Sequence, residues 1–287
     1  MSVLVVGSIN ADRVLRVGHL PAAGETVLAS GLARFPGGKG ANQAVAAARL
    51  GAEVRFIGCV GDDEDGRAMV ANLAEAGVAT NAVRVTRSPT GTAHITVDDY
   101  GQNAIVVSSG ANAQLSPADV DRHRTLVAGA TVVVTQLEVP LETVAKLVEL
   151  SDRVLLNAAP ARAVPAEVLA RVDILVANEV EAAALTPDRS PAVLLDLGPR
   201  AVVVTLGARG AQWWTRAGSG EVAAPVVRPV DTTGAGDAFV GALAAAIAAG
   251  RTLDAAVALA VDVAGQATTV AGAQLPTGLV DPAVLLA

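Results

Sequence analysis

The sequence contains few aromatic residues and few lysines. Phe, Trp and Tyr together make up 2% of its 287 residues, and the lysines are Lys39 and Lys146. The formal net charge is −7. Binding to nucleic acid or to an anionic membrane surface requires clustered lysine and arginine. We therefore expect no nucleic acid and no membrane as a partner.

Cysteine is also nearly absent. Cys59 is the one thiol of the chain, which excludes an intrachain disulfide and any zinc site built from several cysteines. Free cysteine is most often a small buried apolar residue. We expect Cys59 to pack in the core.

Long hydrophobic segments are missing as well. Val3 to Val6 follow the first residues without a basic segment or a cleavage site, which indicates a strand and not a secretory signal. The most apolar later stretch, Ala238 to Ala249, is shorter than the roughly 20 residues needed to span a bilayer. We expect a soluble cytoplasmic protein.

Short β-branched segments alternate along the chain with alanine-rich stretches. Near-continuous hydrophobic strands are typical of a parallel sheet covered by helices on both faces. The sequence therefore predicts an α/β fold, a three-layer doubly wound and mostly parallel sheet, in a single domain over residues 1–287. The expected strands are Val3 to Val6, Val54 to Ile57, Thr131 to Thr135, Val154 to Asn157, Ile174 to Ala177 and Ala201 to Thr205.

Two regions interrupt this alternation. Residues 11–35 and 86–109 carry β-rich patterns, with the turn residues Gly101 and Asn103 between two of the segments. We expect them to pair into a small separate β-sheet, a lid. Such a lid would cover the carboxyl edge of the main sheet, where open α/β folds bind ligands.

A glycine-rich turn precedes a helical segment late in the chain, at Asp231-Thr232-Thr233-Gly234-Ala235-Gly236-Asp237. Its backbone N–H groups and the dipole of the following helix favour an anion, so Gly234, Ala235 and Gly236 are a candidate anion hole. Asp237 is a candidate base that accepts a hydroxyl proton during phosphoryl transfer. Taken alone, the segment is equally consistent with a tight turn and a helix cap.

A second glycine-rich segment, Gly37-Gly38-Lys39-Gly40-Ala41-Asn42-Gln43, opens a helix that ends near Leu50-Gly51. Small residues let a ligand approach the backbone, and Lys39 and Asn42 offer donors to hydroxyl groups. The segment lacks the spacing of a Walker A loop. By itself it is equally consistent with an ordinary helix entry.

A third polar segment, Gly7-Ser8-Ile9-Asn10-Ala11-Asp12, directly follows the first strand. A strand end in this fold points into the ligand crevice, where Asn10 and Asp12 are suited to hold a polyol. An Asx turn at the strand end is the simpler interpretation of the segment in isolation.

Together the three segments resemble the ribokinase-like (PfkB) carbohydrate kinase family. The resemblance extends from about Val3 to Pro276 in the family's order, and the members that phosphorylate ribose fit best. Two departures are expected to lie away from the chemistry: a short segment at 186–199, and the segment Asn157-Ala158-Ala159-Pro160, which has alanine where a proline is common. The remaining matching segments are Gly24-Glu25-Thr26, Gly61-Asp62-Asp63, Gly110-Ala111-Asn112, Gln136-Leu137-Glu138 and Gly272-Ala273-Gln274.

The resemblance implies an ATP-dependent kinase for the 5-hydroxyl of D-ribose, with Asp237 as the catalytic residue. Without this context, Glu138 would be an ordinary carboxylate after a strand. The residues that the resemblance assigns to the sugar are Asn10, Asp12, Gly38, Lys39, Asn42, Glu138 and Asp237.

The resemblance also implies a nucleotide site. Glu181 would belong indirectly to the Mg²⁺ shell, although acidic residues also favour a plain helix N-terminus. The residues that the resemblance assigns to ATP are Asn178, Thr205, Leu206, Gly207, Ala208, Arg209, Gly210, Gly236 and Asp237.

A monovalent-cation site for K⁺ is a further implication of the resemblance. The chain has Pro276 or Thr277 where the family usually has a serine ligand, which leaves potassium dependence less supported than kinase activity. The matching positions are Asp231, Thr233, Ala267, Val270 and Gly272.

Other functions stay open from the sequence. The nearest alternative is a family kinase that acts on deoxyribose, fructose, a keto-deoxy acid or a nucleoside. An acid substrate would require an arginine near the sugar, and a nucleoside would favour aromatic contacts. The matching segments contain neither. A sugar sensor without catalysis would not need the Gly-Ala-Gly-Asp segment. A dinucleotide-binding oxidoreductase would need a G-x-G-x-x-G after the first strand, which is absent.

The resemblance finally implies a homodimer that pairs through its lids. The apolar residues Val14, Leu15, Val17 and Ile105 to Val107 suit such a contact. The same residues are equally suited to pack within their own chain.

Overall fold

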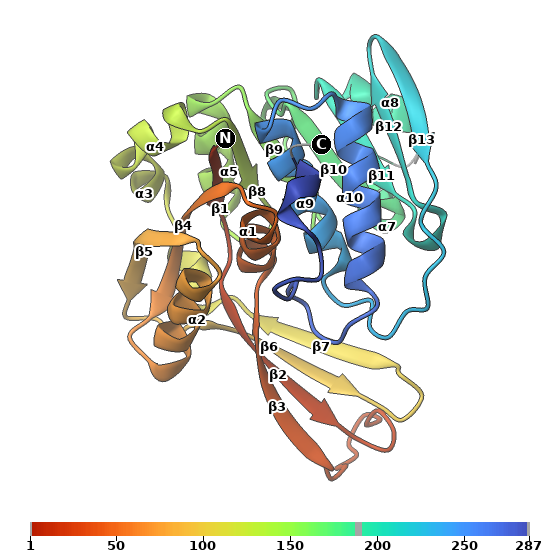
Figure 1. Ribbon diagram of the computed structural model, residues 1–287. Coiled ribbons are helices and arrows are strands. Elements are labelled where there is room, and N and C mark those ends of the chain that lie inside the picture. The colour runs from red at the N-terminus through yellow and green to blue at the C-terminus, as the bar shows by residue number, and fades with distance from the viewer. Residues whose placement is uncertain (1, 187–190, 286–287) are drawn as a thin grey trace.

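The computed structural model describes residues 2–186 and 191–285 and contains a large sheet and a small one (Figure 1). The order in the large sheet is β13-β12-β11-β10-β9-β8-β1-β4-β5. Its strands are β1 (Ser2–Val6), β4 (Glu53–Gly61), β5 (Ala79–Thr86), β8 (Val132–Thr135), β9 (Val154–Asn157), β10 (Ile174–Asn178), β11 (Ala201–Thr205), β12 (Ala211–Thr215) and β13 (Gly218–Val222).

The strands from β5 to β11 pair in parallel, and β12 and β13 add an antiparallel edge. The expected mostly parallel sheet is thus confirmed, and each of the six expected strands is present. β5, β12 and β13 were not expected as strands of this sheet. Thr86, which the prediction assigned to the lid, is the last residue of β5.

Helices cover both faces of the large sheet. One face packs against α1 (Lys39–Arg49), α2 (Glu64–Glu75), α9 (Ala235–Ala248) and α10 (Leu253–Ala267). The other packs against α3 (Pro117–Arg122), α4 (Arg124–Gly129), α5 (Leu141–Leu150), α6 (Ala166–Leu169), α7 (Glu179–Leu185) and α8 (Pro191–Asp196). Figure 1 shows α9 and α10 side by side in front of the sheet and α3 to α5 at its other face.

The sequence of β1 explains why the sheet is covered twice. Val3 and Val5 belong to the core on the α1 and α9 side, whereas Leu4 and Val6 belong to the core on the opposite side. Successive side chains of a strand point to opposite faces of the sheet. A strand that is apolar at every position is therefore buried only when helices pack on both faces. Cys59 is buried in the second core, as expected.

The lid sheet consists of β2 (Asn10–Arg16), β3 (Gly31–Gly37), β6 (Gly91–Val97) and β7 (Asn103–Ser108), in the order β3-β2-β6-β7. It projects below the large sheet in Figure 1. Because β2 begins four residues after β1 ends, the lid joins the large sheet at the carboxyl end of a central strand. The expected separate lid is confirmed.

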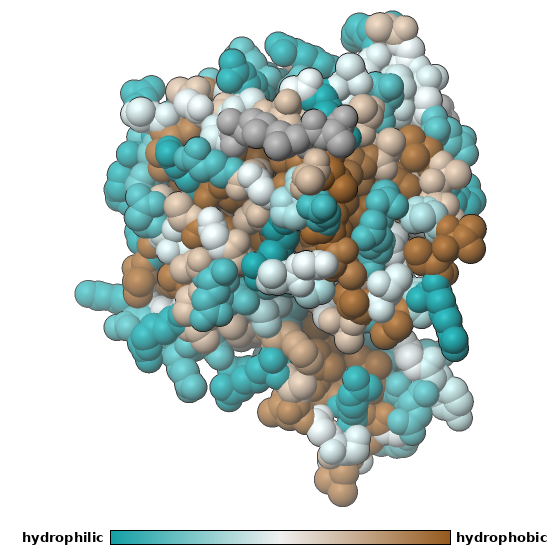
Figure 2. Space-filling view, in the orientation of Figure 1, coloured by the Kyte–Doolittle hydropathy of each residue, from teal (hydrophilic) through white to brown (hydrophobic). Residues whose placement is uncertain are grey.

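Apolar side chains are exposed on the lid. Figure 2 shows brown, apolar atoms in the lower part of the molecule, where the lid lies. Ile105, Val106 and Val107 of β7 are exposed, as are Leu32 and Phe35 of β3. Val17 is 5% exposed and packs within its own chain. The prediction that it takes part in an intermolecular contact is therefore wrong.

Helices α1 and α9 pack closely because Gly241 lies between them. A Cβ atom at Gly241 would lie 2.5 Å from the carbonyl oxygen of Gln43 and 2.6 Å from Cβ of Ala46. Both distances are shorter than van der Waals contact. The absence of a side chain on α9 therefore fixes how near α1 approaches.

We predict that Gly241→Ala destabilises the protein by about 1–3 kcal/mol, because the added methyl forces the two helices apart. Urea unfolding followed by circular dichroism measures the change. Gly129→Ala in α4 is the matched control, since its Cβ would meet nothing within 4 Å, and it should leave stability unchanged or slightly higher. Equal stability of the two variants would contradict the close-contact explanation.

Candidate functional site

The carboxylate of Asp237 lies at the start of α9, beside the turn predicted to bind an anion. Gly234 adopts a left-handed conformation (φ 74°) at the helix N-cap. A Cβ at this position would lie 2.1 Å from the carbonyl oxygen of Ala273, so both backbone conformation and close approach require glycine here. The first-turn amides of α9 and Asp237 are thus brought to the same place.

Two consecutive residues of α1 hold the Asp237 carboxylate. Asn42 Nδ2 donates to Asp237 Oδ2 at 3.0 Å, and Gln43 Nε2 donates to Asp237 Oδ1 at 2.9 Å. Asp237 is 8% exposed. Burial raises its pKa, although nearby Lys39 and the two amides act in the opposite direction. The carboxylate is therefore held in place and is more basic than an exposed aspartate.

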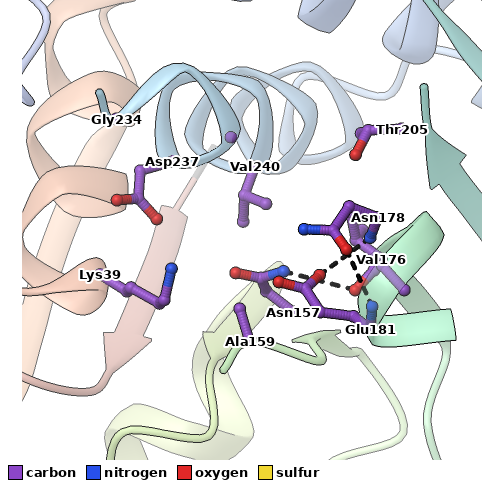
Figure 3. Close-up of a pocket in the computed structure, with 12 residues that line it drawn as sticks. Lys39, Asn157, Ala159, Val176, Asn178, Glu181, Thr205, Gly234, Asp237 and Val240 are labelled. Atoms are coloured by element: carbon purple, nitrogen blue, oxygen red, sulfur yellow. Dashed lines mark hydrogen bonds between the residues drawn. The ribbon is translucent and has the colours of Figure 1, made fainter. Parts of the chain in front are cut away.

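Lys39 extends toward the cavity that Asp237 also lines (Figure 3). Burial acts to lower the lysine pKa, but the carboxylates of Asp237, Glu138 and Glu181 outweigh it and raise the pKa. The ammonium group is therefore charged at neutral pH. The cavity has a volume of about 220 Å³.

The predicted sugar residues gather on the other side of Lys39. Glu138 Oε2 accepts hydrogen bonds from Ser8 Oγ at 2.5 Å and from the backbone N–H of Lys39 at 3.1 Å. Gly38, with φ 88°, caps α1 and approaches the backbone of Asn10. The segments after β1, before α1 and after β8 therefore meet at one place, as parallel strand ends should.

Two of these residues present buried oxygen atoms without a hydrogen-bond partner among the described residues. They are Asp12 Oδ1 and Asn42 Oδ1. Buried polar atoms in native proteins nearly always have a hydrogen-bond partner, so a bound ligand is the expected partner of these two oxygen atoms. Hydroxyl groups of a polyol would donate to both.

Asp12 is another buried carboxyl of this group whose pKa is raised. Burial, followed by the charges of Glu138 and Asp237, raises its pKa to about 7. Gly37 on the neighbouring strand leaves room for it, since a Cβ there would lie 2.2 Å from Asp12 Oδ2.

A larger, mostly apolar cavity of about 570 Å³ adjoins the start of α9. Thr205, Gly207, Ala208, Gly210 and Gly236 of the predicted nucleotide site line it. The other two residues of the β11 turn are placed differently: Leu206 packs against the core, and Arg209 forms an ion pair with Glu179 at 2.6 Å. The cavity joins an apolar wall to a helix N-terminus, which suits a base and its phosphates.

Asn178 and Glu181 form a reciprocal cap at the start of α7. Asn178 Oδ1 accepts from the backbone N–H of Glu181 at 2.8 Å, and Glu181 Oε2 accepts from that of Asn178 at 2.8 Å. The simple helix-start interpretation is therefore correct for both. They also line the Asp237 cavity opposite Lys39 (Figure 3), and burial raises the pKa of Glu181.

The residues predicted for K⁺ form a connected loop next to α9. Asp231 accepts from the backbone N–H groups of Thr233 at 2.9 Å and Gly272 at 3.0 Å. Val270 donates to the carbonyl of Ala267 at 3.4 Å. Burial acts to raise the pKa of Asp231, but these hydrogen bonds lower it, so the loop carries a fixed negative charge beside backbone carbonyls.

Three residues of the site were missed by the sequence analysis. Gln43 contacts Asp237, and Asn157 lines the cavity and accepts from Gln43 at 3.1 Å. Asn112 Nδ2 donates to Asn10 Oδ1 at 2.7 Å. It thereby orients Asn10, which is predicted to bind the sugar. Gln43 and Asn112 lie inside quoted motifs, but each contacts a partner more than 100 residues away in sequence. Motif spacing gives no signal for such distant pairs.

One expectation about the site was wrong. The segment Asn157-Ala158-Ala159-Pro160 does not lie away from the chemistry, since Asn157 and Ala159 both line the Asp237 cavity. Arg162, which lies outside the matching segments, lines a pocket of about 400 Å³ together with Asn10 and Glu138. The other departure from the family pattern, the short segment at 186–199, includes residues 187–190, which lie outside the described residues.

Within residues 2–186 and 191–285, every helix is too short or too polar to span a bilayer. No group of three or more His, Cys, Asp or Glu side chains there is arranged to hold a metal ion by itself. A cation at this site would accordingly rely on carbonyl oxygens, water or a phosphate for its other ligands.

Comparison with known proteins gives a consistent result. Residues 1–278 match the family described as pfkB family carbohydrate kinase. The chain is 41% identical to a ribokinase of Bacillus subtilis over 285 residues, 96% of each chain. It is 39% identical to a deoxyribokinase of Salmonella typhi over 259 residues, 85% of each chain.

A solved structure agrees. The ribokinase of Arabidopsis thaliana, complexed with ribose and ATP, superposes with a TM-score of 0.90 at 31% identity, covering 99% of this chain and 97% of the other. The similarity thus includes the lid and the whole of the large sheet.

We predict that Asp12→Asn stabilises the ligand-free protein at neutral and higher pH. The pKa of Asp12 in the folded protein, about 7, lies above the ordinary value of 3.8. The free energy of unfolding of the parent protein therefore falls as the pH rises from about 3.8 to about 7, because the folded state must give up a proton that it binds more tightly than the unfolded chain does. Asparagine removes that loss, and the gain should reach about 2–4 kcal/mol above pH 7. Thermal unfolding from pH 4 to 8 measures it.

The matched control is Asp62→Asn, because the Asp62 side chain is 84% exposed. Its stability should follow the parent at every pH. A stability difference between Asp12→Asn and the parent that does not change with pH would contradict the raised pKa of Asp12.

Proposed function

The chain belongs to the pfkB family of carbohydrate kinases, and from that premise we propose that it transfers the γ-phosphoryl group of ATP to the 5-hydroxyl of D-ribose. The products are D-ribose 5-phosphate and ADP. The observation that carries the proposal is the Asp237 carboxylate, held by two amides beside a glycine-rich helix start and next to unpaired polyol-binding oxygens. The ribokinases described above support the choice of ribose.

The sugar binds under the lid. Asp12 and Asn42 accept from its hydroxyls, and Asn10, Glu138 and Lys39 supply further polar contacts. Closure of the lid over this place excludes water, which would otherwise accept the phosphoryl group. Gly38 lets the sugar approach the backbone.

Asp237 acts as the base. Its partly raised pKa makes it a better acceptor for the proton of the 5-hydroxyl as the oxygen attacks phosphorus. The backbone N–H groups of Gly234, Ala235 and Gly236 are proposed to stabilise the charge that builds up on the transferred group, which requires the N–H of Ala235 to turn from the carbonyl of Thr232 that it contacts at 3.3 Å. Lys39 adds a positive charge to the same cavity.

The nucleotide occupies the cavity between the β11 turn and α9. Magnesium bound with ATP would supply the positive charge that neutralises the phosphates, as in other kinases. The donor set suits this hard cation, because Asn157 and Glu181 line the cavity opposite Lys39 and carry oxygen atoms. Glu181, already engaged in the helix cap, is suited to contact it through water.

The loop of Asp231, Thr233, Ala267, Val270 and Gly272 is proposed to hold K⁺. A negative carboxylate beside backbone carbonyls fits a large monovalent cation, and Gly272 has a positive φ of 103° that only glycine adopts readily. The cation would hold the loop against Gly234 and so order the anion hole.

Pairing of two copies through the lid stays a prediction. The exposed apolar residues of β7 and β3 support it, because an exposed apolar edge strand is otherwise a site of aggregation. Reaction in the cytoplasm, where ATP is available, is also proposed.

Arg162 favours a second candidate substrate, a sugar acid. Arg162 lines the pocket that contains Asn10 and Glu138, and arginine binds carboxylates well. Glu138 in the same pocket disfavours an anion, so we rank this candidate after ribose.

The decisive experiment measures ADP release from Mg²⁺-ATP with ribose, deoxyribose, fructose, a keto-deoxy sugar acid and nucleosides. We expect strong turnover with D-ribose. Asp237→Asn should lower kcat by at least about a hundredfold with little change in ribose KM, because the base is lost while the contacts remain.

Turnover with a different sugar would keep the mechanism but change the substrate. Ribose binding without turnover by the parent protein would support a sensor and overturn the kinase. Similar kcat for Asp237→Asn and the parent would overturn the role of Asp237.

The cation site gives a further prediction. Replacing K⁺ by tetramethylammonium at constant ionic strength should lower the activity several-fold, and Asp231→Ala should abolish the response to K⁺. Activity that is independent of K⁺ in the parent would remove the cation from the proposal and leave the kinase reaction intact.

A further inference from the structure

Gln43 touches the proposed base without reaching the cavity. Its side chain is fully buried, and it is not among the residues that line the pocket at Asp237. Its Nε2 nevertheless donates to Asp237 Oδ1 at 2.9 Å, while Asn42 occupies the other carboxylate oxygen. Any effect of Gln43 on the reaction therefore passes through Asp237.

A chain of amides fixes which way the Gln43 side chain faces. Asn157 Nδ2 donates to the backbone carbonyl of Val176 at 3.4 Å, so Asn157 Oδ1 is turned toward Gln43 and accepts from its Nε2 at 3.1 Å. Gln136 Nε2 donates to Gln43 Oε1 at 2.7 Å. Because carbonyl and carboxylate oxygens only accept, this network has one consistent arrangement, with a donor facing Asp237.

Gln136 is itself held at the ends of two strands. It directly follows β8 and is fully buried. A Cβ at Gly7 would lie 2.3 Å from Gln136 Oε1, so the glycine after β1 makes room for it. The network thus connects the base on α9 to the carboxyl ends of β1, β8 and β9.

We propose that Gln43, held by Gln136, is a positioning residue that fixes the plane of the Asp237 carboxylate toward the substrate hydroxyl. The proposal rests on the proposed kinase function. One amide on each oxygen prevents rotation of the carboxylate, and loss of either lets it turn. A base displaced by even 1 Å can cost about a hundredfold in rate.

The test is Gln43→Leu, which keeps the volume and removes the donor. We expect kcat to fall about ten- to a hundredfold with ribose KM within about threefold, because Gln43 does not line the cavity. The acid limb of kcat/KM should move to higher pH, since a hydrogen bond that favours the charged carboxylate is lost.

A ligand-free readout accompanies the kinetics. Carbon NMR of protein labelled in its aspartate carboxyls, with Asp237→Asn to assign the signal, follows the titration of Asp237 directly. We expect its midpoint to rise by about one pH unit in Gln43→Leu.

Two variants control for misfolding. Gln136→Met leaves the Gln43 donor in place but frees its amide to turn, so the same changes should appear at smaller size. Gln212→Leu removes an exposed amide that donates to Glu221 at 2.8 Å, and should leave kinetics and titration at parental values.

The outcomes separate this inference from the proposed function. A folded Gln43→Leu protein with parental kcat and parental Asp237 titration overturns the positioning role while the kinase stands. A fall in kcat without any shift in titration or acid limb indicates general loosening and also overturns it. If the parent phosphorylates no sugar, the kinase function fails, and the ligand-free titration alone decides whether Gln43 holds Asp237.

Discussion

The close contact between α1 and α9 is the constraint on which the rest of the site depends. Asp237 on α9 is buried, and a buried carboxylate is costly unless it is hydrogen-bonded. Its two donors, Asn42 and Gln43, lie on α1, so they reach it because Gly241 lets the helices approach. Packing and chemistry are therefore set by the same helix pair, and neither can change alone.

Negative charge around one lysine is the second constraint. Charge–charge interactions connect the carboxylates of Asp12, Glu138 and Asp237 with one another or with the ammonium group of Lys39. Burial and the neighbouring carboxylates raise the pKa of Asp12 to about 7. Such an arrangement opposes folding, since like charges are held close in a low-dielectric place. It is expected where polar groups are prepared for a ligand, because functional sites commonly carry strain that the rest of the fold offsets.

The sequence predicted the central fold because the buried parallel strands are apolar on both faces, and it predicted the motifs because glycines mark turns. It missed β12 and β13, whose edge positions expose polar residues such as Gln212 and Glu221, and β5, whose pattern is only half apolar. It also missed the partners of Asp237 and Asn10. Gln43 and Asn112 are remote from them in sequence, and only the packed fold shows which amide faces which carboxylate.

The choice of sugar depends on atoms that sequence patterns do not place. A site that hydrogen-bonds a substrate hydroxyl discriminates strongly against an analogue that lacks it, because its own polar groups are then left unpaired. Here Asp12 Oδ1 and Asn42 Oδ1 are unpaired among the described residues, so a sugar with fewer hydroxyls would leave at least one of them buried without a donor. Asn42 also holds Asp237, so the proposed recognition of the hydroxyls is linked to the placement of the proposed base. On this proposal, the site favours a fully hydroxylated sugar.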